Sequence, residues 1–148
     1  MDMPNRGVVR SGMSFSAPPA LLPFTPTLAG RTVLVIEDHE DSREMLSAVL
    51  RSLQAHVLAA SNIVEAEHEL HMTRPHLIIC DLKLPDGSGL DFIKWLRAHR
   101  QWALTPCIAI TGWKDHFPDA VIKQFDSFMV KPVDLDRFCN AAIALTQR

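Results

Sequence analysis

A strand-like run that ends in a carboxylate constrains the fold of this chain more than any other feature. Residues 77–80, Leu-Ile-Ile-Cys, form an uninterrupted apolar run, which is typical of a strand covered on both faces of a parallel sheet. Asp81 follows at once, and Pro85, Asp86 and Gly87 then favour a turn. Asp81 is therefore predicted at the carboxyl end of a buried strand, the edge where open α/β sheets bind ligands. For this Asp taken alone, hydrogen bonding to the turn backbone is the alternative.

The rest of the chain alternates short apolar runs with helical patterns. The other predicted strands are residues 32–36, 55–59, 106–110 and 125–130. The predicted helices are residues 41–53, opened by a capping box from Asp41 to Glu44, residues 62–72 with Asn62 as cap, residues 90–100, a short segment after Pro118, and a last helix capped by Asp134. This alternation predicts an α/β fold, a doubly wound five-stranded parallel sheet with helices on both faces.

Composition narrows the class of protein. The chain has 148 residues, 47% of them apolar and 22% charged, which fits one globular domain with a sizeable core. The net charge of −2 argues against a nucleic-acid-binding surface. No stretch approaches the ~20 apolar residues that a membrane span needs. Three widely spaced cysteines in apolar contexts predict free thiols, and a cytoplasmic location is expected.

The first 30 residues differ in composition from the rest. Five prolines lie among Ser, Thr, Gly and Ala residues, namely Pro4, Pro18, Pro19, Pro23 and Pro26. Such a segment cannot bury enough surface to offset the entropy of ordering it. We therefore expect a disordered tail over residues 1–30 and a single domain over residues 31–148.

Polar side chains follow the apolar part of four predicted strands: Glu37 and Asp38, Asp81, Thr111, and Lys131. Parallel strands bring these groups to one edge of the sheet. Three neighbouring carboxylates repel one another, so a cation is expected among them, and oxygen ligands suit Mg²⁺. A carboxylate can attack phosphorus to form an aspartyl phosphate, with a metal ion and a lysine stabilising the charge. The pattern indicates magnesium-dependent phosphoryl transfer.

These segments resemble the receiver domain of two-component response regulators. The similarity covers residues 32–147, and the matching motifs are Val-Leu-Val-Ile-Glu-Asp at 33–38, Ile-Ile-Cys-Asp-Leu-Lys-Leu-Pro-Asp-Gly at 78–87, Ile-Ala-Ile-Thr-Gly at 108–112 and Phe-Met-Val-Lys-Pro at 128–132. The resemblance implies a chemotaxis-receiver-like single domain with a flavodoxin-like fold and strand order 2-1-3-4-5. It also implies a cis peptide bond before Pro132.

The resemblance further implies how the phosphorylation site works. Asp81 is expected to accept the phosphoryl group from a sensor histidine kinase or a histidine phosphotransfer protein, and Thr111 and Lys131 to contact that group. The implied Mg²⁺ ligands are Glu37, Asp38, Asp81 and the backbone carbonyl of Lys83. No enzymatic activity is expected beyond self-phosphorylation and self-dephosphorylation.

Signal output and kinase docking are also implied by the resemblance. Thr111 and Phe128 match the switch residues of the family. Ser42, Met45 and Val49 match its kinase-docking face, for which a broad core-facing stripe is the alternative. Because no effector domain is expected, output should pass through contact with an unidentified downstream protein or through onward phosphotransfer.

Two other functions are alternatives to this prediction. A receiver-fold adaptor that works without phosphorylation is the main alternative, because the stretch between Thr111 and Lys131 is shorter than usual and carries Gln124 and Phe125 in place of small residues. An aspartyl-phosphate phosphatase is disfavoured, because Lys83 stands where that class has a second acid to protonate the leaving group.

Overall fold

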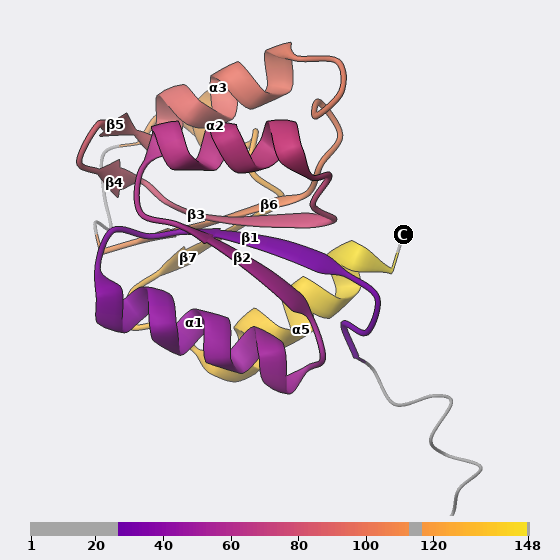
Figure 1. The fold of residues 1–148 in the computed structure, drawn as a ribbon. Coiled ribbons are helices and arrows are strands. Elements are labelled where there is room, and N and C mark those ends of the chain that lie inside the picture. Colours follow the sequence, from indigo (N-terminus) through magenta and orange to yellow (C-terminus); the bar gives the residue numbers. More distant parts are fainter. Residues whose placement is uncertain (1–26, 113–116, 148) are drawn as a thin grey trace, which may run out of the picture.

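Five parallel strands form the central sheet of the computed structural model, which describes residues 27–112 and 117–147 (Figure 1). These strands are β1 (Thr32–Ile36), β2 (His56–Ala60), β3 (Leu77–Asp81), β6 (Cys107–Thr111) and β7 (Ser127–Val130). They lie in the order β2-β1-β3-β6-β7, and each neighbouring pair is parallel. Counting only these strands, this is the order 2-1-3-4-5, which confirms the predicted doubly wound, flavodoxin-like fold.

Helices cover both faces of the sheet, with α1 and α5 on one face and α2 and α3 on the other (Figure 1). Their bounds are α1 (Glu40–Ser52), α2 (Ile63–Met72), α3 (Gly89–Ala98), α4 (Asp119–Ile122) and α5 (Leu135–Thr146). Alternate strand residues enter opposite cores, as the two-residue period of a strand requires. Leu34 of β1 lies in one core with Phe92 of α3, whereas Val35 lies in the other core with Phe138 of α5. Burial on both faces explains why the three central strands, β1, β3 and β6, are almost continuously apolar.

The structure corrects the predicted start of α1. The helix begins at Glu40 after His39, whose side chain makes no capping hydrogen bond, so the capping box from Asp41 to Glu44 is wrong. The cause lies in the preceding loop, where the backbone N–H of His39 donates to the side chain of Glu37 and fixes the chain direction before Asp41. The predicted caps of α2 and α5 are confirmed, because Asn62 and Asp134 each accept a backbone N–H from the first turn.

Three strands begin one or two residues later than predicted. β2 covers 56–60 instead of 55–59, β6 covers 107–111 instead of 106–110, and β7 begins at 127 instead of 125. Phe125 shows why apolar character misled the prediction, since it is buried in the loop before β7 and packs in the core shared with Val121 of α4. A buried loop residue and a strand residue look alike in sequence.

A short hairpin after Asp81 was not predicted. It pairs β4 (Lys83–Leu84) with β5 (Gly87–Ser88). Each of these strands has only two residues and is too short to show a periodic pattern in the sequence. The helix α3 then begins at Gly89, where a Cβ atom would lie 2.6 Å from the backbone oxygen of Asp81. A side chain does not fit in this space, so Gly89 allows α3 to start directly against the end of β3.

Other features agree with the sequence. The Lys131–Pro132 peptide bond is cis. Cys80, Cys107 and Cys139 are free thiols. Within the described residues, every helix is too short or too polar to cross a membrane. Most of the predicted tail, residues 1–26, lies outside the described part of the chain, but Leu28 is fully buried and its N–H donates to the carbonyl of Leu53. Packing against the domain therefore includes residues before position 31.

Candidate functional site

An ion-pair network lies at the carboxyl edge of the sheet. The Nζ atom of Lys131 is 2.8 Å from Oε1 of Glu37 and 3.0 Å from Oδ2 of Asp81. The side chains of Glu37 and Asp81 are only 2% and 8% exposed, and that of Lys131 is 30% exposed. These residues follow or end β1, β3 and β7, so the parallel sheet brings together three groups that are far apart in sequence.

Burial and hydrogen bonding have opposite effects on the pKa of Glu37, and likewise on the pKa of Lys131. Burial raises the pKa of Glu37, and its hydrogen bonds from Lys131 and from the backbone of His39 offset this only in part. Burial alone would lower the pKa of Lys131, but its hydrogen bonds to Glu37 and Asp81 outweigh this and raise it. One ammonium is therefore shared between two buried acids, and the network favours additional positive charge.

Three carboxylates form a cluster that can hold such a charge. Glu37, Asp38 and Asp81 each offer one oxygen, and these oxygens lie within 4.8 Å of one another. Asp38 is exposed, so the cluster opens to solvent. An all-oxygen, half-open donor set with incomplete charge balance fits Mg²⁺, which keeps part of its water shell when it binds to proteins.

An open cleft of about 490 Å³ connects the cluster to the remaining predicted site residues. Its lining includes Asp38, Asp81, Thr111 and Lys131. Thr111 ends β6 and is 2% exposed, and its carbonyl accepts the backbone N–H of Lys131 at 2.8 Å. The structure thus places the predicted phosphate-contacting residues beside the predicted acceptor.

Lys83 contributes through its backbone. Its N–H donates to Oδ1 of Asp81 at 3.1 Å, while Oδ2 of the same carboxylate pairs with Lys131. Pairing of Lys83 with Ser88 in the β4–β5 hairpin fixes this part of the backbone. Both oxygens of Asp81 are therefore engaged, which holds the carboxylate in one orientation at the cleft.

The predicted switch residue Phe128 lies in an aromatic cluster beside the site. Its ring centroid is 5.8 Å from that of Phe117 and 6.4 Å from that of Phe125, both in edge-to-face arrangements. Phe128 does not line the cleft that Thr111 lines. The structure therefore brings the two predicted switch residues to the neighbouring strands β6 and β7.

The predicted docking residues on α1 differ in their surroundings. Ser42 lines the cleft, and Met45 is 43% exposed. Val49 is half-buried and packs against the core beneath α1. At this position the structure fits the alternative, a broad core-facing stripe.

Sequence reasoning missed His39, which lines the cleft, and Arg43, which contacts the loop that carries the acidic pair. Arg43 makes its side-chain hydrogen bonds to backbone carbonyl groups. Such contacts leave no residue pattern by which they could be recognised.

Comparisons with known proteins agree with the fold and the motifs. The family model of the response regulator receiver domain matches residues 33–143. The polar-differentiation response regulator DivK of Brucella anthropi is 27% identical over 110 residues, covering 73% of this chain and 89% of DivK. The response regulator protein PilR of Pseudomonas aeruginosa is 30% identical over 110 residues, which are 74% of this chain but only 25% of PilR.

Among solved structures, the response regulator TrrA of Thermotoga maritima, in complex with Mg(2+)-BeF, matches with a TM-score of 0.71 and 23% identity, covering 78% of this chain and 98% of TrrA. At this identity the match speaks for the fold alone, which is that of the receivers. The chain belongs to the response regulator receiver domain family, whose members act in two-component signalling.

Proposed function

We propose that this protein is a phosphoacceptor of a two-component phosphorelay, and that Asp81 takes the phosphoryl group from a phosphohistidine. The donor is a sensor histidine kinase or a histidine phosphotransfer protein. The observation that carries the proposal is the setting of Asp81, whose carboxylate faces an open cleft, pairs with Lys131 at 3.0 Å and lies beside two further acids.

The chemistry follows from these positions. An oxygen of Asp81 attacks phosphorus, so that an O–P bond forms while the P–N bond to the donor histidine breaks and the imidazole nitrogen keeps the bonding pair. Lys131 lies where its ammonium can neutralise a phosphoryl oxygen, and Thr111, which lines the same cleft, contacts the phosphoryl group through its hydroxyl. Mg²⁺, held by Glu37, Asp38, Asp81 and the Lys83 carbonyl, supplies further neutralisation of phosphoryl charge when bound.

Phosphorylation then switches a protein-binding face through Thr111 and Phe128. Partners must bind one state better than the other for a signal to pass. Ser42 and Met45, at the rim of the cleft and on the exposed side of α1, are the proposed donor-docking residues. The protein has no activity beyond the gain and loss of its own phosphoryl group.

A phosphorylation-independent adaptor is the second candidate. One observation favours it: α4, which borders the proposed switch region, has only four residues. A shortened α4 leaves little helix to be repositioned, so binding through this face would then depend on its fixed shape.

The deciding experiment is incubation with a small acyl phosphate, with and without Mg²⁺, followed by intact-mass analysis. We expect one metal-dependent phosphate on the wild type and on Asp91→Asn, a control at an exposed acid of α3, and none on Asp81→Asn. A folded wild-type protein that binds Mg²⁺ but gains no phosphate would favour the adaptor.

A further inference from the structure

We propose that Arg43 is a positioning residue for the acidic cluster: it holds the loop of residues 37–39 in the conformation that binds a divalent cation. The inference rests on the proposed function in one respect, namely that the cluster holds Mg²⁺. It concerns a residue whose side-chain hydrogen bonds go to backbone carbonyl groups and not to the carboxylates of the cluster.

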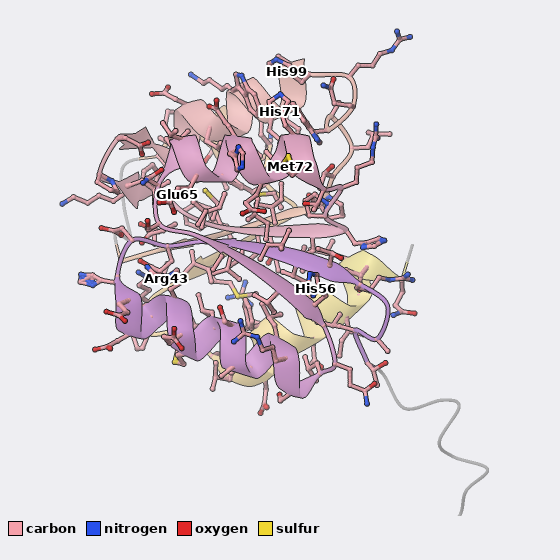
Figure 2. The ribbon with its side chains drawn as sticks, in the orientation of Figure 1. Arg43, His56, Glu65, His71, Met72 and His99 are labelled. Carbon is pink, nitrogen blue, oxygen red and sulfur yellow. The ribbon has the colours of Figure 1, made fainter. Side chains whose placement is uncertain are left out.

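Three consecutive carbonyl groups of this loop accept hydrogen bonds from Arg43. Its Nη1 atom donates to the carbonyl oxygens of Glu37 at 3.0 Å and Asp38 at 3.3 Å, and its backbone N–H donates to that of His39 at 2.9 Å. Figure 2 shows Arg43 between the first turn of α1 and the end of β1. The Arg43 side chain therefore restrains the carbonyl groups of Glu37 and Asp38. The bond to His39 is the first main-chain hydrogen bond of α1 and does not depend on the side chain.

This restraint matters most for Asp38. The carboxylate of Glu37 is held directly by Lys131 and by the backbone N–H of His39, and it is buried. Asp38 is exposed, so the direction of its carboxylate depends on the loop backbone that Arg43 fixes. Pre-organised ligands bind a metal more tightly because less freedom is lost on binding.

The position of Arg43 argues against a role in helix stability alone. It lies in the first turn of α1, where the helix dipole disfavours a positive charge. Two interactions account for a cation at this point: the guanidinium donates hydrogen bonds to the carbonyl groups of the acidic loop, and its charge attracts the carboxylate of Glu65. The Arg43 side chain is half-buried, and its guanidinium group makes these two hydrogen bonds in place of contacts with water.

Positioning and simple electrostatics predict opposite results for a neutral replacement. The charge of Arg43 repels a bound cation, so its removal alone would tighten Mg²⁺ binding. Loss of the carbonyl contacts would instead loosen the loop and weaken binding. The sign of the change in affinity therefore identifies which effect dominates.

The test measures the Mg²⁺ dissociation constant of the full chain by calorimetric titration, for the wild type, Arg43→Met and Arg43→Lys. We expect Arg43→Met to bind Mg²⁺ about 3- to 30-fold more weakly, which corresponds to one or two hydrogen bonds' worth of lost restraint. Arg43→Lys, which keeps the charge but not the planar fork, should recover part of the affinity. Arg51→Met, an exposed position in the last turn of the same helix, should bind as the wild type does.

Binding by Arg43→Met that is equal to or tighter than that of the wild type would overturn the proposal. If Arg43→Met does not fold, Arg43→Lys carries the test, and an affinity equal to that of Arg51→Lys would overturn it. A wild-type protein that takes up no Mg²⁺ would instead refute the metal site of the proposed function, and the inference with it.

Discussion

Lys131 is the residue that balances part of the charge of the buried acids Glu37 and Asp81. Breaking a fully buried ion pair costs about 3–5 kcal/mol and an exposed one about 0–1 kcal/mol. Because Lys131 is 30% exposed while its two partners are buried, we expect Lys131→Met to lower the free energy of unfolding by about 1–3 kcal/mol at neutral pH without metal. Urea denaturation measures this, with exposed Lys94→Met as control.

Added Mg²⁺ should reduce the loss in Lys131→Met, because the ion then neutralises the same carboxylates. An equal loss with and without Mg²⁺ would mean that Lys131 and the metal do not share them.

Glu37 gives the site a pH dependence of defined sign. Its pKa in the folded protein is raised above the ordinary value of 4.5, so the folded state binds more protons between the two values, and stability falls as pH rises through that window. The pKa of Lys131 is raised as well, but its contribution is lost only above the ordinary value of 10.5. Glu37→Gln should therefore gain stability relative to the wild type as pH rises from below 4.5 toward neutrality.

The measurement for Glu37 is urea denaturation at several pH values in Mg²⁺-free buffer. If the free energies of unfolding of the wild type and Glu37→Gln change with pH in the same way, burial does not raise the pKa of the Glu37 carboxyl group.

At the scale of residues, the sequence predicted the groups that sit at strand ends and missed those that act through the backbone. Asp81, Thr111 and Lys131 each end or follow an apolar strand, and a parallel sheet leaves no choice about which edge they share. The roles of Arg43 and of the N–H of Lys83 depend on loop conformation, which local residue types do not determine.

At the scale of elements, Asp86 joins the hairpin beside the site to α2. Its two carboxylate oxygens accept the backbone N–H groups of Ile63 at 2.8 Å and Val64 at 3.0 Å. Burial alone would raise the pKa of Asp86, but these hydrogen bonds outweigh it and lower the pKa. The carboxylate thus satisfies two of the N–H groups that a helix leaves unpaired at its start.

We expect Asp86→Ala to lower the free energy of unfolding by about 1–2 kcal/mol, the usual cost of a lost helix cap. Phosphorylation by a small acyl phosphate should persist, since Asp86 does not line the cleft. Asp91→Ala, an exposed acid in the first turn of α3, is the matched control. An Asp86→Ala protein as stable as this control would show that the contact between hairpin and helix contributes nothing.

The same scale separates predictable elements from unpredictable ones. Helices with several turns, such as α1 and α5, were found because their apolar spacing repeats. The hairpin β4–β5 is too short to repeat any spacing and was not predicted. The four-residue α4 is also too short for this, but Pro118 favours a helix start, and the helix predicted after it is confirmed. The strands are predicted from their apolar character. Phe125 is apolar as well but is buried in a loop, so the predicted strand begins too early.

At the scale of the whole molecule, the sheet separates two cores and the site lies where both end. Leu34 and Ile36 of β1 face the core under α2 and α3, while Val33 and Val35 face the core under α1 and α5 (Figure 1). The carboxylates and Lys131 come together only when both layers are assembled on the sheet. A ligand of this edge therefore binds the native state and not the unfolded chain, and must stabilise the domain as a unit.

This linkage gives a prediction that uses no kinase. Mg²⁺ with beryllofluoride, a stand-in for the phosphoryl group, should add about 2.7 kcal/mol at a concentration 100-fold above its dissociation constant. For a domain of this size, that corresponds to a rise in Tm of about 8–14 °C. Thermal unfolding followed by circular dichroism measures the shift. We expect no such rise in Tm for Asp81→Asn, because an amide at position 81 lacks the negative charge that would bind beryllofluoride. An equal rise in Asp81→Asn would place the ligand elsewhere and remove the support for Asp81 as the acceptor.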